Sequence, residues 1–252
     1  MANILILGAG SMGTAFSFPC SDNNHAVSIV GTHLENDFID QINSKKIHPG
    51  LNCAVPSGVK FLKFTKFGEE IKKNMDLVVV AVTSKGIDWA AVELSKVLKT
   101  NVPILILTKG LAINDNNYEI LADKMERLLK KNGLKEISIS AAGGPCLAKE
   151  LANKTHTSVV FANKDLKTAK QISKLASTDY YHIFTSDDVV GVEVCAAIKN
   201  IFSMAIGASQ GFPNLFATKD VREKNYLNTA AALVHESIRE MIIFTEKLKG
   251  KR

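Results

Sequence analysis

Residues 3–13, with the sequence NILILGAGSMG, decide the fold of this 252-residue chain. The four aliphatic residues from Ile4 to Leu7 predict a strand that is buried on both faces. The six residues from Gly8 to Gly13 follow the pattern G-x-G-x-x-G, and a helix is expected from about Met12. Glycines at these positions permit a tight turn, leave room for a pyrophosphate and let the helix pack closely on the strand. This stretch therefore predicts a dinucleotide site.

Six further apolar runs predict strands, and they lie over residues 26–30, 77–82, 104–107, 137–141, 158–161 and 180–184. Between them, apolar residues recur with helical spacing over residues 87–98, 120–129 and 169–175. Strands that alternate with helices are typical of βαβ units in a mainly parallel sheet. We therefore expect an α/β fold of the Rossmann type, with a dinucleotide-binding domain over residues 1–186.

The pattern changes near Asp187. From Val189 to about Ala208 the chain is almost continuously apolar, which predicts a helix buried on every side. A polar loop over residues 213–224 separates it from a second long helix, expected over about 226–248. We therefore expect an all-helical segment over residues 187–252.

Composition and charge narrow the classes of partner. The net charge is +6, but basic residues are not interleaved with aromatic ones, so no nucleic-acid binding is predicted. No apolar run approaches the ~18 residues of a membrane span, and the N-terminus lacks the basic region of a signal peptide. Neither the four cysteines nor the histidines show metal-ligand spacing, so no metal site is predicted. We expect the cysteines to be free thiols, which indicates a reducing compartment. We expect a cytoplasmic protein whose histidines 48, 156, 182 and 235 are structural.

The second strand lacks the usual mark of a site selective for NAD. Such sites carry Asp or Glu at the end of the second strand, where the carboxylate binds the ribose hydroxyls. Here Thr32 and His33 follow the strand, and Glu35 comes only later. Thr32 or His33 could therefore lie beside the ribose, and both NAD and NADP remain candidate cofactors. A plain exposed loop residue is the alternative for His33.

Two lysines are candidates for the chemistry. Lys199 lies inside the apolar helix that begins at Val189, where a lone cation suits a proton donor. Lys109 follows the predicted strand over residues 104–107, at the edge of the sheet where ligands gather. Solvated or structurally paired lysines are the alternatives. We expect Glu193, which precedes Lys199 on the helix, to pair with another cation.

Five segments together resemble one family, the NAD(P)-dependent sn-glycerol-3-phosphate dehydrogenases. They are Gly8–Thr14, Thr108–Leu111 (TKGL), Gly144–Ala152 (GPCLAKELA), Gly191–Asn200 (GVEVCAAIKN) and Asn228–Met241. The resemblance covers nearly the whole chain. It implies a Rossmann domain, a helical domain, and hydride transfer between a nicotinamide and dihydroxyacetone phosphate or sn-glycerol 3-phosphate, a small phosphorylated substrate.

The resemblance also implies roles for particular residues. Lys199 would be the catalytic acid/base, and the substrate would be bordered by Lys109, Gly144, Cys146, Lys199 and Asn200. The cofactor would be bound by Gly8, Gly10, Ser11, Met12, Gly13, Thr32, Lys109 and Ala148. Cys146 stands where the family usually has Ser or Thr, which would make it a weaker hydrogen-bond donor.

The helical segment is expected to be incomplete relative to the family, because two later family segments have no counterpart here. Two other interpretations therefore stay open. One is a related two-domain dehydrogenase of hydroxy acids, and the other is a non-catalytic dinucleotide-binding remnant. A shortened helical domain would expose apolar helix faces, so a homodimer is also expected.

Overall fold

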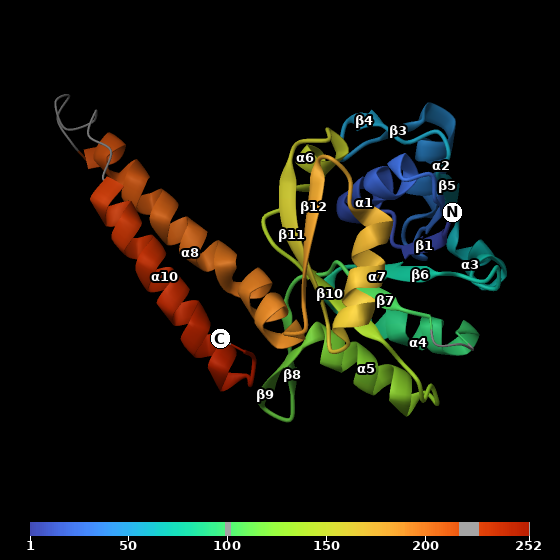
Figure 1. The fold of residues 1–252 in the computed structure, drawn as a ribbon. Coiled ribbons are helices and arrows are strands. Elements are labelled where there is room, and N and C mark those ends of the chain that lie inside the picture. Colours follow the sequence, from blue (N-terminus) through green and yellow to red (C-terminus); the bar gives the residue numbers. More distant parts are fainter. Residues whose placement is uncertain (99–101, 217–226, 252) are drawn as a thin grey trace.

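The computed structural model describes residues 1–98, 102–216 and 227–251. Its centre is an eight-stranded sheet with the order β12-β11-β10-β7-β6-β1-β2-β5 (Figure 1). All neighbouring strands are parallel except β10 and β11. The strands are β1 (Asn3–Leu7), β2 (Ala26–Val30), β5 (Lys60–Leu62), β6 (Leu77–Val80), β7 (Ile104–Ile106), β10 (Ile139–Gly143), β11 (Thr157–Asn163) and β12 (Tyr181–Ser186). The predicted mainly parallel α/β fold is confirmed.

Helices cover both faces of this sheet, so alternate residues of β1 enter different cores. Ile4 and Ile6 pack with α1, α2, α6 and α7, whereas Leu5 and Leu7 pack with α3, α4 and α5. This is the period-two alternation of a strand, with both faces apolar because both are covered. The helices are α1 (Ser11–Asp22), α2 (Asn36–Lys45), α3 (Phe67–Glu70), α4 (Ile87–Val97), α5 (Leu121–Lys131), α6 (Ala148–Ala152) and α7 (Leu166–Ala176).

Several short elements were not predicted. They include β5, the helices α2 and α3, and two hairpins, β3 (Ile47–His48) with β4 (Cys53–Ala54) and β8 (Leu111–Asn114) with β9 (Asn117–Ile120). Strands of two to four residues are too short to establish an alternation in the sequence. Two of these elements, α2 and the β3–β4 hairpin, are important for the site, because they pack beside the glycine loop.

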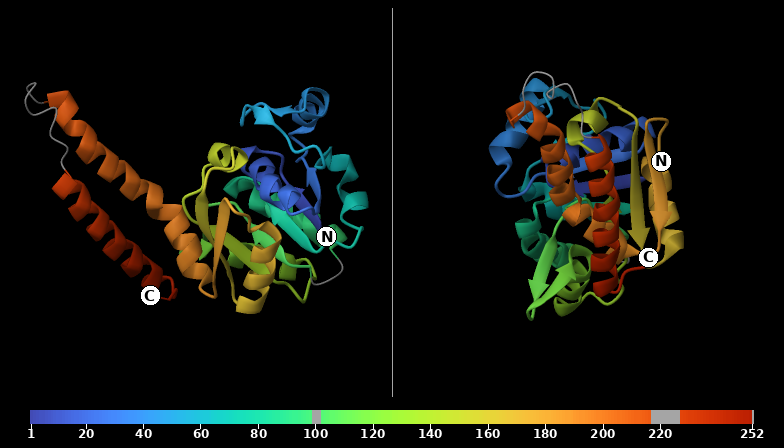
Figure 2. Two further views of the ribbon diagram at one scale, coloured as in Figure 1. Left: turned by 45° about the horizontal axis from the view of Figure 1, so that its top comes forward. Right: turned by 90° about the vertical axis from the view of Figure 1, so that its left-hand side faces the viewer.

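Two long helices, α8 (Val189–Phe216) and α10 (Leu227–Lys247), lie side by side and project away from the sheet (Figures 1 and 2). Only the beginning of α8 is buried, as at Val189 and Val194. The expectation of a helix buried on every side is therefore wrong beyond the sheet, where Ile201 is 65% and Met204 74% exposed. The sequence shows that α8 is apolar, but it does not show which part of the protein packs against the helix.

Exposed apolar side chains lie on α10 as well as on α8, and two of them, Ile238 and Ile242, also line the cavity between the helices and the sheet. We call these exposed side chains the apolar stripe: Ile201, Met204, Leu227, Val234, Ile238 and Ile242. Residues 189–211 are also long and apolar enough to cross a membrane, contrary to the expectation that no stretch would be. That run includes the charged residues Glu193 and Lys199, and its first turns pack against β10 and β11. It is thus weak evidence for a membrane span.

Candidate functional site

The three glycines of the loop after β1 have three different surroundings. Gly8 has φ +111°, and a Cβ there would lie 2.7 Å from the carbonyl oxygen of Ala81. A Cβ on Gly13 would collide with the carbonyl oxygen of Gly8, so α1 can approach β1 only without a side chain there. A Cβ on Gly10 would meet no atom within 4 Å. The open space at Gly10 is therefore where a ligand can reach the backbone.

Helix α1 presents its first turn to the same region. Gly10 is the N-cap residue, has an extended backbone and provides no side-chain cap. Its first turn, which includes Ser11 and Met12, carries no acidic residue. The free N–H groups and partial positive charge of a helix N-terminus favour an anion such as a pyrophosphate.

A carboxylate returns to the glycine loop shortly after β2 ends. The Glu35 Oε2 atom accepts hydrogen bonds from the backbone N–H of Thr32, at 2.7 Å, and of Ala9, at 3.2 Å. Glu35 is the N-cap residue of α2, and the turn from β2 into that helix brings its side chain back to the glycine loop. Thr32 thus lies next to the loop, whereas the His33 ring packs on Trp89, with ring centroids 5.2 Å apart.

A cavity of about 310 Å³ opens beside the glycine loop at the carboxyl ends of β6 and β7. Met12 and Lys109 line it, together with Thr83 and Ser84, which the sequence analysis did not identify. Their position directly after a buried strand was the available signal, because ligands gather at such strand ends. The Thr108 hydroxyl donates to the Val82 carbonyl at 2.6 Å and so holds the two strand ends together.

Lys109 connects this cavity to the GPCLAKELA segment. Its Nζ donates to the Gly144 carbonyl at 3.5 Å, and the same two residues line a smaller space with Cys146. Burial lowers the pKa of Lys109, and the charge of Lys199 lowers it further. Burial raises the pKa of the Cys146 thiol, although the charge of Lys109 opposes this. The two lysines are therefore close enough to interact electrostatically.

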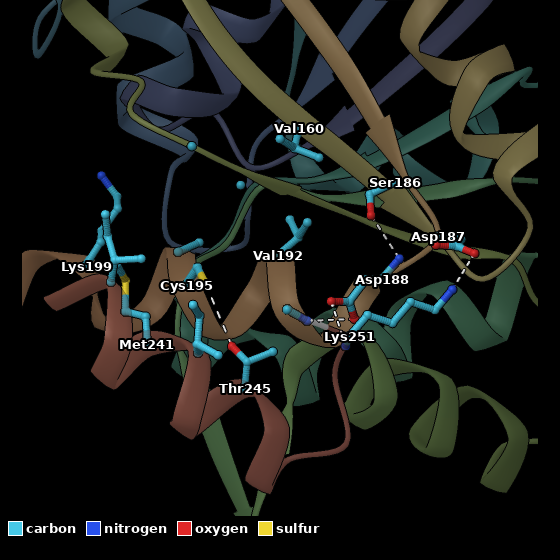
Figure 3. A pocket seen from close by; sticks show the side chains of 16 residues that line it. Val160, Ser186, Asp187, Asp188, Val192, Cys195, Lys199, Met241, Thr245 and Lys251 are labelled. Atoms are coloured by element: carbon cyan, nitrogen blue, oxygen red, sulfur yellow. Dashed lines mark hydrogen bonds and ion pairs between the residues drawn. The ribbon is translucent and has the colours of Figure 1, made fainter. Parts of the chain in front are cut away.

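A second cavity, of about 650 Å³, lies between the sheet and the two long helices (Figure 3). Figure 3 shows Lys199 at one end and the Lys251–Asp187 ion pair at the other. Between them the lining is mainly apolar, with Val160, Val192 and Met241. Gly143 and Gly144 line both this cavity and the smaller space beside Lys109. Neighbouring cavities thus share lining residues from the glycine-loop side, through Lys109 and Gly144, to the cavity with Lys199.

The other predicted residues have varied positions. Ala148, the first residue of α6, packs on the same core cluster as Met12 and Cys146. Asn200 is exposed and is not among the residues that line the cavity beside Lys199. The four cysteines are free. Among the described residues, no group of three or more His, Cys, Asp or Glu side chains is placed to hold a metal ion.

Glu193 differs from its expected role. It is buried, and its Oε2 accepts a hydrogen bond from the backbone N–H of Ala122 at 2.9 Å. The partner is therefore the first turn of α5 and not a cation. Burial raises the pKa of this carboxyl to about 8. The contact ties the start of α8, six residues before Lys199, to the helix that follows the β8–β9 hairpin.

Comparison with known proteins gives consistent matches along the chain. A family model described as "NAD-dependent glycerol-3-phosphate dehydrogenase N-terminus" matches residues 3–169, and its C-terminus counterpart matches residues 188–252. An NADP(+)-dependent glycerol-3-phosphate dehydrogenase of Archaeoglobus fulgidus is 30% identical over 99% of this chain and 71% of its own length. A glycerol-3-phosphate dehydrogenase [NAD(P)+] of Clostridium tetani is 31% identical over 99% of this chain and 65% of its own.

A solved structure supports the fold independently. The glycerol-3-phosphate dehydrogenase of Coxiella burnetii superposes with a TM-score of 0.79 at 24% identity, over 99% of this chain and 70% of that chain. The chain therefore spans roughly two thirds of the length of these relatives.

Proposed function

From the premise that this chain belongs to the NAD-dependent glycerol-3-phosphate dehydrogenase family, we propose that it reduces dihydroxyacetone phosphate to sn-glycerol 3-phosphate with NADH or NADPH, in support of glycerophospholipid synthesis. One observation carries the proposal. A small space lined by Lys109 and Gly144 lies between the cavity beside the glycine loop, which Lys109 also lines, and the cavity that contains Lys199, which Gly144 also lines. A dinucleotide and a small substrate could thus meet between two cations.

The residues of the first cavity fit a nicotinamide dinucleotide. The open space at Gly10 and the uncapped first turn of α1 would receive the pyrophosphate, and Thr32 would lie toward the ribose. Met12 and Thr83 would border the nicotinamide end, since both line the cavity beyond the loop. When bound, the reduced cofactor supplies the hydride for the carbonyl carbon.

Lys199 and Lys109 would act on the substrate. The oxygen of the carbonyl gains negative charge as the hydride arrives, and a nearby ammonium group stabilises it. We assign the proton transfer to Lys199 Nζ, and the second positive charge to Lys109. Gly144 and Cys146 border the same space and would position the substrate, as would Asn200 after a change of side-chain rotamer. Binding energy from the remote phosphate would help to align the carbonyl.

A steady-state assay tests this proposal directly. Oxidation of NADH or NADPH should depend on dihydroxyacetone phosphate and give equimolar sn-glycerol 3-phosphate. Turnover of a hydroxy acid instead would indicate a related two-domain dehydrogenase. Dinucleotide binding without any turnover would support a non-catalytic remnant, an alternative favoured by the exposed apolar stripe.

We further propose that the protein is cytoplasmic. We also propose that a second copy of the chain covers the apolar stripe. Several exposed apolar side chains on two adjacent helices are typical of an interface in soluble proteins. Met204→Glu, at an exposed position on α8, should then shift the mass in multi-angle light scattering from dimer to monomer, while Val92→Glu, at an exposed position on α4, should not. We also retain the proposed domain boundary, with residues 1–186 binding the dinucleotide and 187–252 completing the substrate site.

A further inference from the structure

The peptide groups of Ala9 are held from two sides by side chains outside the glycine loop. Ala9 is fully buried and occupies the first x of G-x-G-x-x-G. Its N–H donates to the Glu35 carboxylate at 3.2 Å, and its carbonyl oxygen lies 3.1 Å from His48 Nε2. Glu35 comes from the start of α2, and His48 from the β3–β4 hairpin. Neither residue is close to Ala9 in the sequence.

The hydrogen bonds of His48 fix its tautomer. Its Nδ1 accepts the backbone N–H of Leu51 at 3.0 Å, so Nδ1 carries no hydrogen. Nε2 must therefore carry it and donate to the Ala9 carbonyl. The ring is only 1% exposed and lies edge-on to Phe38, with centroids 4.9 Å apart. Only the neutral ring can both donate to the Ala9 carbonyl and accept from the Leu51 N–H. If Nδ1 were protonated, two donors would face each other, the Nδ1–H of His48 and the N–H of Leu51.

The same hairpin also contacts α1. A Cβ on Gly50 would lie 2.8 Å from Ser11 Oγ, so the loop between β3 and β4 passes directly over the first residue of the helix. The loop thus reaches both parts of the anion site, the peptide before Gly10 and the first turn of α1. A shift of the hairpin would therefore move the atoms that the pyrophosphate must contact.

We propose that His48, together with Glu35, is a positioning residue that holds the glycine loop in its dinucleotide-binding form, and that protonation of His48 releases the loop and weakens dinucleotide binding. This inference rests on the proposed function only in requiring that the chain bind a dinucleotide. His48 contacts no ligand itself, but acts through Ala9 and the Gly50–Ser11 contact.

The surroundings of His48 favour its neutral form. Burial lowers the pKa of His48, although the carboxylate of Glu35 opposes this. The other titratable groups nearby are Cys53, which pairs with His48 across the hairpin, and Lys149, which acts on Cys53. Burial raises the pKa of the Cys53 thiol, so it stays neutral in mildly acidic solution. We therefore assign to His48 a loss of affinity as the pH falls below the ordinary histidine range, and the variant His48→Gln tests that assignment.

The experiment measures NAD⁺ affinity by calorimetry between pH 5 and 8, because the pyrophosphate and NAD⁺ itself do not titrate there. In the parent protein the Kd should rise as the pH falls. His48→Gln keeps a donor for the Ala9 carbonyl but cannot titrate, so its affinity should be near the parent value at pH 8 and change little with pH. His48→Ala removes one of the two side-chain donors to the Ala9 carbonyl and leaves only the Thr14 hydroxyl, at 3.1 Å. It should weaken binding at pH 8 by up to about tenfold, the effect of one buried hydrogen bond. His182→Gln, at an exposed histidine, is the matched control and should follow the parent.

Reciprocity gives a test that needs no variant. If binding favours neutral His48, saturating NAD⁺ must lower the pKa of His48, which NMR of the labelled imidazole can follow in the parent protein. An unchanged pKa on binding would overturn the proposal, even if the variants failed to fold. So would the same pH dependence in His48→Gln as in the parent. If the parent bound no NAD⁺ at any pH, the proposed function would fail first.

Discussion

The glycine-loop end of the molecule and the α8–α10 pair are built in opposite ways. Around Gly8 and Gly13 each backbone contact is fixed by neighbouring strands, and Ala9 is hydrogen bonded through both its N–H and its carbonyl. Along α8, burial ends where the helix leaves the sheet, and apolar side chains such as Ile201 and Met204 are exposed. The proposed cofactor half of the site is thus fixed within the Rossmann domain. The proposed substrate half depends on the two helices, and Lys199 lines the cavity between them and the sheet.

The largest effect is expected where the two regions meet. Lys199→Met keeps most of the side-chain volume and removes the charge, so turnover of dihydroxyacetone phosphate should fall at least ~10²-fold. NAD⁺ affinity should remain, because the glycine loop is elsewhere. Steady-state kinetics and calorimetry measure the two quantities. Lys251→Met, at the opposite end of the same cavity, is the control and should retain turnover. Equal losses in both variants would show that the cavity needs positive charge in general and not Lys199.

Within the proposed cofactor half, substitutions at two glycines should distinguish an effect on NAD⁺ binding from an effect on folding. Gly10→Val places a side chain in open space, so the fold should be kept while NAD⁺ binding is abolished. Gly13→Val drives a side chain into the Gly8 carbonyl and Ala81, so overpacking should lower the free energy of unfolding by about 1–3 kcal/mol or more. Denaturant unfolding and calorimetry distinguish the pair. Retained NAD⁺ affinity in Gly10→Val would place the dinucleotide elsewhere.

The stability of the folded protein should depend on pH through Glu193, which ties the start of α8 to α5. Its pKa is raised to about 8 in the folded protein by burial, whereas the unfolded chain ionises near the ordinary value of 4.5. The folded state therefore binds more protons between these values, and its stability falls as the pH rises from 4.5 to 8. The slope approaches about 1.4 kcal/mol per pH unit. Glu193→Gln should remove that part of the slope in urea titrations, whereas Glu240→Gln, at an exposed position on α10, should leave it.

The sequence predicted the parts of this site that depend on local chemistry. The roles of Gly8, Gly10 and Gly13 follow from the backbone that a strand-to-helix turn requires, and the strand ends placed Lys109. The return of Glu35 to the glycine loop could not be predicted, because it depends on where α2 begins. The part played by His48 depends on a hairpin of two-residue strands. The exposure of α8 was also missed, because an apolar sequence does not specify its partner.

The smallest effect concerns the choice between NADH and NADPH, and it tests whether Glu35 belongs to the loop or to the ligand. A carboxylate that faces the ribose repels a 2′-phosphate. Glu35 instead directs Oε2 at the N–H groups of Ala9 and Thr32, which neutralise part of its charge. We therefore expect the Kd values for NADH and NADPH to agree within about tenfold, or ~1.4 kcal/mol. Fluorescence titration with both cofactors measures the ratio, and Glu35→Gln should change it little while weakening both. A thousandfold preference for NADH that Glu35→Gln abolishes would show that this carboxylate turns to the ribose, so that even the fixed half of the site rearranges when the cofactor binds.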